Sequence, residues 1–390
     1  MKKNSIRIIT IIFLCVVPVW MMLCKDVMFS QKENRNLASF PKLTWTTLVN
    51  GEFMDDFETY LADQFPARDW CVSLKTAVLR VTGKRMINDV YIAKDNYLIA
   101  KESDVKDGQL SEMTDTLNLF AEKMDNIRVN LMLVPNASLV YEDKLPYGAE
   151  SDEDTIINIV KNQISEKVNY VDVYNTLMEH KSEGLYYKTD HHWTSKGAYY
   201  SFLEYASANG ITPVDYEFYP VTGSFQGTQA SNCGIYNTFE TISLCIPENS
   251  VGTYVVRYVN DDRTTTTLFD ESKLNEKDKY QVFMGGNYAE VDISTTAGTG
   301  KNLMIIKDSY ANCFIPMLTP YYDKIIVIDP RYFYDDIYTI AQINKVNEVL
   351  FMYNVNSFVD DNSLRDIIVR EEKLNENLNS TCKLKFHNED

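Results

Sequence analysis

The chain has 390 residues, of which 45% are hydrophobic and 12% aromatic, a composition typical of a globular protein rather than a disordered one. Its 38 lysine and arginine residues against 55 aspartate and glutamate residues give a formal charge of −17 at pH 7. A negative charge of this size argues against nucleic acid as a partner, because the phosphate backbone would be repelled.

The chain begins with positive charges followed by an apolar segment. Lys2, Lys3 and Arg7 precede the sixteen uncharged residues 8–23, whose length lies between a signal-peptide core and the roughly 20 apolar residues that span a bilayer. Since no Ala-x-Ala cleavage site follows, we expect residues 1–25 to be an uncleaved signal anchor, with a cleaved signal peptide and a secreted protein as the alternative. The positive end would stay inside, so the rest of the chain is expected outside the cytoplasm at the cell membrane.

Before the first expected buried strand, residues 53–100 contain helical and strand-like patterns. Residues 53–81 have a helical pattern that breaks at 64–68, where Pro66 disfavours helix at the residue before it. Asp63 and Arg68 flank this break, and we expect them to form a structural ion pair. Two short strand-like segments, 90–93 and 97–100, predict a hairpin.

Helical and strand-like segments then alternate, as they do around a parallel sheet. Between 210 and 300, Thr, Tyr, Val and Gly dominate and helical periodicity fades, so we expect a β-rich insertion there. We expect residues 26–390 to form an α/β domain around a parallel sheet flanked by helices. The expected helices are 108–123, 152–166, 311–318, 334–343 and 364–378, and the expected strands are 127–134, 170–173, 302–307, 324–328 and 346–353.

The seven cysteines do not form a dense disulfide framework. Two of them, Cys15 and Cys24, lie in the expected anchor. Of the other five, Cys233 and Cys245 are the only close pair that we consider for a disulfide.

Residues 186–197 hold two of the four histidines of the chain next to a carboxylate. Histidine is the side chain that most often moves protons near neutral pH, and a carboxylate bonded to one ring nitrogen fixes its tautomer. Asp190 and His192 are two positions apart, so on an extended segment their side chains share a face and that of His191 points away. Thr194 or Ser195 would cap a helix over 196–209, which predicts a strand-to-helix loop.

Two other interpretations of this loop remain open. The histidine could be structural, or the loop could hold a metal. We expect no metal, because His180 and His387 are the only other histidines and no further ligand spacing is present.

A serine follows the strand expected at 302–307. Asp308 and Ser309 form the turn before a helical segment, and a helix N-terminus favours the negative charge that develops near a nucleophile. Ser309 could instead be a simple helix cap. Because the expected sheet would bring Asp190, His192 and Ser309 to one edge, they could act as orienter, base and nucleophile.

Other polar residues follow the expected strands and turns. Arg331, Tyr353 and Asn354 are candidate walls of the same pocket, and Arg331 could bind substrate or anchor a loop. Asn287 lies in a glycine-containing turn. Residues 223–228 could be a loop that closes over the site, or only a turn.

These segments together resemble the DHHW family of exported bacterial proteins and, more distantly, the SGNH-hydrolase-like alginate O-acetyltransferases. The resemblance covers nearly everything beyond the anchor. The segments that carry it are Glu33-Asn34-Arg35-Asn36-Leu37-Ala38, Asp63-Gln64-Phe65-Pro66-Ala67-Arg68, Thr189-Asp190-His191-His192-Trp193, Lys307-Asp308-Ser309-Tyr310-Ala311-Asn312 and Ile328-Asp329-Pro330-Arg331-Tyr332-Phe333.

The resemblance implies an SGNH-hydrolase-like fold in which Asp190, His192 and Ser309 are a catalytic triad. Lys307 stands where the family of hydrolases has glycine, and their Gly-x-Asn-Asp block has no clean counterpart, so the oxyanion donors are open. The backbone N–H of Ser309 is the first candidate, and Asn287, Tyr353 or Asn354 are others.

The function implied is that of an exported O-acetyltransferase acting on hydroxyls of a cell-surface or secreted polysaccharide through an acetyl-serine intermediate. No cofactor is implied, but acetyl would have to come from a membrane-bound O-acyltransferase partner, since acetyl-coenzyme A is cytoplasmic. A carbohydrate acetylesterase with the same triad and a non-catalytic carbohydrate-binding or assembly protein are the alternatives.

Overall fold

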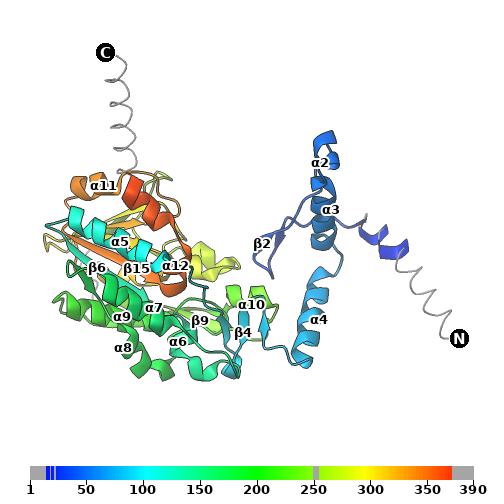
Figure 1. Ribbon diagram of the computed structural model, residues 1–390, viewed down its shortest axis with the longest axis horizontal. Coiled ribbons are helices and arrows are strands. Elements are labelled where there is room, and N and C mark those ends of the chain that lie inside the picture. Colours follow the sequence, from blue (N-terminus) through cyan, green and yellow to red (C-terminus); the bar gives the residue numbers. More distant parts are fainter. Residues whose placement is uncertain (1–14, 18, 22, 249–253, 371–390) are drawn as a thin grey trace, which may run out of the picture.

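The computed structural model describes residues 15–370 except 18, 22 and 249–253 (Figure 1). In this part of the chain, eight strands form one sheet. In order across the sheet they are β11 (Arg263–Thr265), β10 (Tyr254–Tyr258), β12 (Glu290–Thr295), β14 (Lys324–Ile328), β13 (Asn302–Lys307), β15 (Glu348–Asn354), β6 (Arg128–Val134) and β7 (Val168–Tyr170).

The sheet is mixed, which corrects the prediction of a parallel sheet. The five strands from β14 to β7 are parallel to one another, whereas β12 pairs antiparallel with β14 and with β10, and β10 pairs antiparallel with β11. The antiparallel strands come from the β-rich segment expected at 210–300, so this segment extends the main sheet. Strands β10 and β11 are joined by residues 259–262, a short connection that favours antiparallel pairing, whereas parallel neighbours need a crossover of a dozen or more residues.

Alternating side chains of the central strands point to two cores. On β13, Leu303 and Ile305 belong to one core and Met304 and Ile306 to the other. Figure 1 shows α5 and α11 on one side of β6 and β15, and α8 and α9 on the other. The first layer contains α5 (Gln109–Lys123), α7 (Glu153–Gln163), α11 (Ile337–Ile343), α12 (Val355–Asp360) and the helical residues 363–370, and the second contains α6 (Ala137–Val140), α8 (Tyr174–Glu179), α9 (Ser195–Ala208), η6 (Ser309–Cys313) and η7 (Ile315–Leu318).

Smaller elements pack against the second helix layer. Strands β8 (Tyr216–Phe225) and β9 (Glu240–Pro247) form an antiparallel pair, and α10 (Thr228–Cys233) lies between them in the chain. Strands β3 (Met86–Ile87), β4 (Val90–Ile92) and β5 (Leu98–Ala100) form a small sheet that contains the predicted hairpin. Cys233 and Cys245 are both free thiols in the structure, so the disulfide considered between them is absent.

The N-terminal arm, residues 29–81, stands beside the body in Figure 1. It contains β1 (Phe29–Ser30), β2 (Arg35–Asn36), α2 (Trp45–Val49), α3 (Glu52–Asp63) and α4 (Arg68–Val81). The predicted ion pair between Asp63 and Arg68 is present at 3.5 Å, and Arg35 joins it. The arm contacts the body through Thr76, whose hydroxyl donates to the backbone carbonyl of Cys233 at 2.9 Å.

Some predicted elements differ from the structure. The segment predicted as a helix over 311–318 forms the two 3₁₀ turns η6 and η7, and the strand predicted over 170–173 ends at Tyr170. Within the described residues no helix is long and apolar enough to cross a membrane. Most of the expected signal anchor lies outside these residues, so that expectation remains a prediction.

Candidate active site

The loop that precedes α9 is fastened along its backbone. An isolated bridge pairs Tyr186 with Trp193. The carboxylate of Glu240, at the start of β9, accepts hydrogen bonds from the backbone N–H groups of Lys188 (2.6 Å) and Thr189 (2.8 Å). A loop held in this way presents its side chains with little freedom, as a catalytic arrangement requires.

Asp190 is buried at the centre of a set of hydrogen-bond donors. Its Oδ1 accepts from the backbone N–H of His192 at 3.0 Å and from Nδ1 of the same histidine at 2.5 Å. Its Oδ2 accepts from the backbone N–H of Thr228 at 2.8 Å and from the Thr228 hydroxyl at 3.0 Å. Gly227 makes this approach possible, because a Cβ there would lie 2.2 Å from the Asp190 carboxylate.

The other ring nitrogen of His192 reaches the serine after β13. Nε2 of His192 lies 2.8 Å from Oγ of Ser309, so with the proton on Nδ1 the ring can accept the serine hydroxyl hydrogen. Asp308 fixes the turn, because its carboxylate accepts from the backbone N–H groups of Tyr310 (2.9 Å) and Asn354 (2.8 Å). The structure therefore brings the three predicted residues Asp190, His192 and Ser309 into one hydrogen-bonded chain.

Aromatic rings surround His192. The ring of Tyr280 stacks on the imidazole with centroids 3.8 Å apart and planes 11° apart, and Tyr310 lies at 5.2 Å. Trp193 is fully buried and its Nε1–H donates to the backbone carbonyl of Tyr310 at 3.0 Å. These contacts limit rotation of the imidazole and keep water from one of its faces.

The electrostatics of the loop favour an ionised Asp190. Burial by itself would raise the pKa of this carboxyl, but His191, His192 and the backbone N–H of Thr228 outweigh burial and hold the pKa of Asp190 well below its usual range. A carboxylate that stays ionised can stabilise the imidazolium that forms when a base accepts a proton.

The expectation that His191 points away from Asp190 is wrong. Residues 188–192 form bends rather than an extended strand, so side chains do not alternate. Nδ1 of His191 lies 3.7 Å from Oδ1 of Asp190 and 2.8 Å from the Thr228 hydroxyl, and its ring lies 3.9 Å from that of His192. Burial, together with the nearby His192 and Arg331, lowers the pKa of His191 to about 4, although 37% of the side chain is exposed.

Asp190, His191 and His192 are also the only group among the described residues whose donor atoms are close enough together to hold a metal ion. Three such donors could serve a zinc ion. In the structure Nδ1 of His192 is bonded to Asp190 and its Nε2 to Ser309, so both of its nitrogens already have partners. This bonding favours proton transfer over metal binding at His192.

A second buried carboxylate, that of Asp329, lies beside Lys307, two residues before Ser309. Asp329, directly after β14, accepts from Nε (2.8 Å) and Nη2 (2.6 Å) of Arg331 and from Nζ of Lys307 (3.3 Å). Burial would raise the pKa of Asp329, but the hydrogen bond from Arg331 and the charge of Lys307 lower it. Arg331 is therefore anchored at the wall of the site and remains 34% exposed at its side chain.

The predicted oxyanion donors differ in whether their donor groups are free to bind a ligand. The Asn354 amide is engaged, because its NH₂ group donates to the carbonyls of Asn136 and Val134. Tyr353 packs in the core of the α5 layer, and its buried hydroxyl has no hydrogen-bond partner among the described residues. The Asn287 carbonyl accepts from Lys307 at 2.9 Å and from Asn312 at 3.1 Å, and in the described part of the chain its NH₂ group donates to no protein atom.

Several residues of this arrangement were not among the predicted site residues. Gly227 and Thr228 lie in the segment 223–228, which the sequence presented as either a loop over the site or a turn, and the structure shows that its end contacts Asp190. Tyr280 and Glu240 carried no local signal, because an isolated aromatic or acidic residue in a β-rich segment is not distinctive.

The chain is similar to a known protein family and to solved structures with the same fold. The model of the DHHW protein family matches residues 118–328, which are 211 of the 390 residues. No curated protein matches the chain. A DHHW family protein from Eubacterium siraeum is 28% identical, with a TM-score of 0.62 over 73% of this chain and 95% of that one.

Two further solved structures are similar at lower identity. Bacillus cereus PatB1 with a sulfonyl adduct is 18% identical, with a TM-score of 0.62 over 71% of this chain and 97% of that one. The O-acetyltransferase domain of Pseudomonas putida AlgJ is 13% identical, with a TM-score of 0.46 over 72% of this chain and 98% of that one. The PatB1 likeness shows a shared mixed α/β fold.

Proposed function

The chain belongs to the DHHW family, and we propose that it is an exported O-acetyltransferase that acetylates hydroxyls of a cell-surface or secreted polysaccharide through an acetyl-Ser309 intermediate. The observation that carries this proposal is the hydrogen-bonded chain from Asp190 through His192 to Ser309, with distances of 2.5 and 2.8 Å. An orienting carboxylate, a base and a nucleophile in this order are the parts that acyl transfer needs.

In the first half-reaction, Oγ of Ser309 attacks the acetyl carbonyl carbon while Nε2 of His192 takes the hydroxyl proton. Asp190 stabilises the resulting imidazolium. The tetrahedral intermediate collapses, the bond to the leaving group breaks, and His192 returns the proton to that group. Acetyl is then bound to Ser309 as an ester.

In the second half-reaction, His192 takes the proton of a sugar hydroxyl, whose oxygen attacks the acetyl-Ser309 carbonyl. Collapse of the second intermediate releases the acetylated sugar, and the proton on Nε2 returns to Oγ of Ser309. The negative oxygen of both intermediates needs donors, and we assign the backbone N–H of Ser309 and the NH₂ group of Asn287 to this role. Hydrogen bonds from Lys307 and Asn312 to the Asn287 carbonyl support the assignment, because they orient the amide.

The acetyl donor outside the cytoplasm would be a membrane-bound O-acyltransferase partner, and the predicted N-terminal anchor would keep this chain at the same membrane. The reaction as written needs no cofactor. Water in place of the sugar hydroxyl would make the same triad an acetylesterase, so the acceptor has to be tested directly.

The test uses purified protein with p-nitrophenyl acetate as donor. We expect release of p-nitrophenol and an acetyl group on Ser309 detectable by peptide mass spectrometry. Ser309→Ala should abolish both, whereas the matched variant Ser207→Ala, at an exposed position of α9, should keep wild-type rates. PatB1 has been solved with a sulfonyl adduct, and a sulfonyl fluoride should label the wild type but not Ser309→Ala.

Adding an oligosaccharide acceptor separates transfer from hydrolysis. Acetylated oligosaccharide identifies a transferase, and acetate alone identifies an esterase. A folded Ser309→Ala protein that keeps wild-type activity would remove the catalytic assignment. A wild type that is as inactive as Ser309→Ala would favour the carbohydrate-binding alternative.

A further inference from the structure

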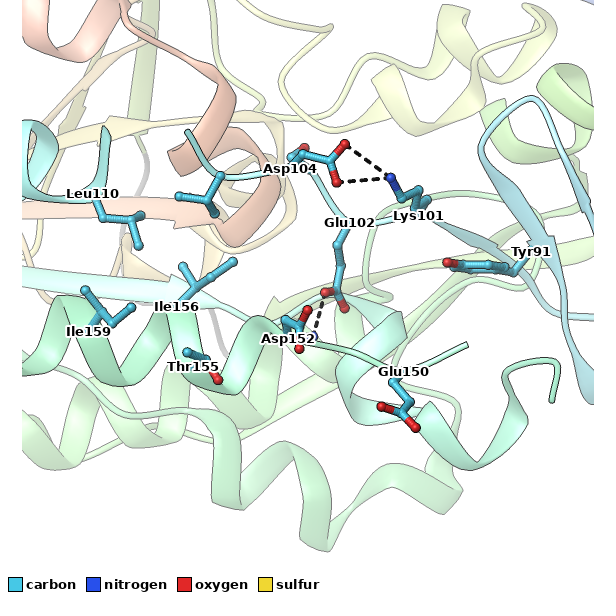
Figure 2. Close-up of a pocket in the computed structure, with 12 residues that line it drawn as sticks. Tyr91, Lys101, Glu102, Asp104, Leu110, Glu150, Asp152, Thr155, Ile156 and Ile159 are labelled. Carbon is cyan, nitrogen blue, oxygen red and sulfur yellow. Dashed lines mark hydrogen bonds and ion pairs between the residues drawn. The ribbon is translucent and has the colours of Figure 1, made fainter. Parts of the chain in front are cut away.

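A cavity of about 440 Å³ lies outside the triad, between the segment 101–105 and the helices α5 and α7 (Figure 2). Its volume is in the range of small-molecule sites. None of the side chains that line it takes part in the proposed acetyl transfer.

The chain segment that lines this cavity also lines a smaller cavity beside the triad. A smaller cavity of about 170 Å³ is lined by Asp190, His191 and Asn356 together with β5, which ends at Ala100. The next residues, Lys101 to Ser103, line the larger cavity. One stretch of extended chain therefore lines both cavities in succession.

Hydrogen bonds hold this stretch in place between the cavities. The Asn356 amide accepts from the backbone N–H of Ser103 at 3.1 Å and donates to the carbonyl of Lys101 at 3.4 Å. Glu102 accepts from the backbone N–H of Asp152 at 2.9 Å. The wall of the larger cavity is thereby fastened both to α12 and to the start of α7.

The lining of the larger cavity has two sides. Figure 2 shows Leu110, Ile156 and Ile159 gathered on one side, and the charged side chains together with Tyr91 toward the other. An apolar wall opposite polar groups suits a sugar ring, whose C–H face packs on hydrocarbon while its substituents meet polar atoms.

The charge of the polar side is strongly negative. It contains one lysine and four carboxylates, those of Glu102, Asp104, Glu150 and Asp152. Asp104 pairs with Lys101 at 3.1 Å, and Glu102 is engaged by Ser151 and the Asp152 backbone. The carboxylates of Glu150 and Asp152 form no ion pair within the described residues and are exposed, so they remain available for a cation.

We propose that this cavity binds a hexosamine unit with a free ammonium group, in the same polysaccharide whose hydroxyl accepts acetyl from Ser309. That the ligand is a polysaccharide rests on the proposed function. That its sugar is a hexosamine rests on the side chains that line the cavity. Glu150 and Asp152 bind the ammonium group, while Leu110, Ile156 and Ile159 contact the ring. A uronate or phosphate polymer is disfavoured, because each of its charges would be repelled by unpaired carboxylates.

The experiment measures binding of the glucosamine hexamer and of the N-acetylglucosamine hexamer to the full-length protein carrying Ser309→Ala, by titration calorimetry at low salt. We expect the glucosamine hexamer to bind about tenfold more tightly, and Glu150→Gln with Asp152→Asn to remove this preference, as the loss of two exposed charge pairs predicts. Raising the salt concentration should reduce the preference, since exposed pairs are screened.

The matched control is Asp115→Asn with Glu122→Gln, which removes the same charge from exposed positions of α5 and should leave both affinities unchanged. Absence of glucosamine hexamer binding, equal binding of the two hexamers, unchanged affinity in the Glu150/Asp152 variant, or tighter binding of an oligolysine of equal charge would each overturn the proposal. Because no turnover is involved, this result is independent of whether Ser309 is catalytic.

Discussion

The two buried aspartates Asp190 and Asp329 have different kinds of partner. Asp190 is bonded to His192, whose other ring nitrogen faces the hydroxyl of Ser309, whereas Asp329 accepts hydrogen bonds from the basic side chains of Lys307 and Arg331. Both carboxyls have a lowered pKa in spite of burial. We infer from the difference in partner that the region around Asp190 can transfer a proton, whereas the region around Asp329 holds side chains in place.

The largest effect should come from Asp190→Asn. Asparagine keeps the shape of the side chain but can present its NH₂ group to Nδ1 of His192, which selects the wrong tautomer. We expect kcat for p-nitrophenyl acetate hydrolysis to fall about 10⁴-fold, as in serine-protease triads. Steady-state kinetics and circular dichroism check this, and a fold-intact variant with less than a tenfold loss would contradict the role of Asp190.

Asp329→Asn should act mainly on stability. The change leaves Lys307 buried beside Arg331 without its ion-pair partner, and breaking a buried ion pair costs about 3–5 kcal/mol. Urea denaturation measures the unfolding free energy. The control Asp125→Asn removes an exposed pair with Lys167 and should change stability little. Equal unfolding free energies for Asp329→Asn and Asp125→Asn would contradict the structural role of Asp329.

Asn287→Ala tests whether the region around Asp329 and Lys307 serves catalysis by orienting the Asn287 amide. Loss of one oxyanion donor typically lowers kcat about 10²–10³-fold. We expect this loss in kcat with little change in KM, and Asn287→Asp should not restore activity because it lacks the NH₂ group. Wild-type kcat in Asn287→Ala would leave the backbone N–H of Ser309 as the assigned donor.

The smallest effect concerns His191. Its pKa is lowered from 6.5 to about 4 in the folded protein, so between these values the unfolded chain binds the proton more tightly. Stability linked to His191 is therefore complete above pH 6.5 and is lost as the pH falls toward 4. Thermal unfolding across this window should show a shallower acid destabilisation in His191→Gln, and an unchanged pH profile would contradict it.

Much of the body was predictable because its signals are local. The segment 302–307 is apolar throughout and ends in polar residues, and it forms β13 as predicted. Helix α9 begins after Thr194, whose side chain accepts from the backbone N–H of Gly197, as its capping pattern indicated. The helix predicted at 311–318 failed because Pro316 and the tight turn after Ser309 leave only 3₁₀ geometry.

The sequence by itself determined which chemical groups the candidate site contains, because side-chain identity makes Asp190 a carboxylate, His192 a potential proton acceptor and Ser309 a potential nucleophile. Only the tertiary structure decided their distances, the direction of His191 and the contact of Gly227 and Thr228 with Asp190. The tertiary structure also decided that the sheet is extended by antiparallel strands. These features depend on contacts between segments far apart in the chain, and local periodicity carries no information about which distant segments meet.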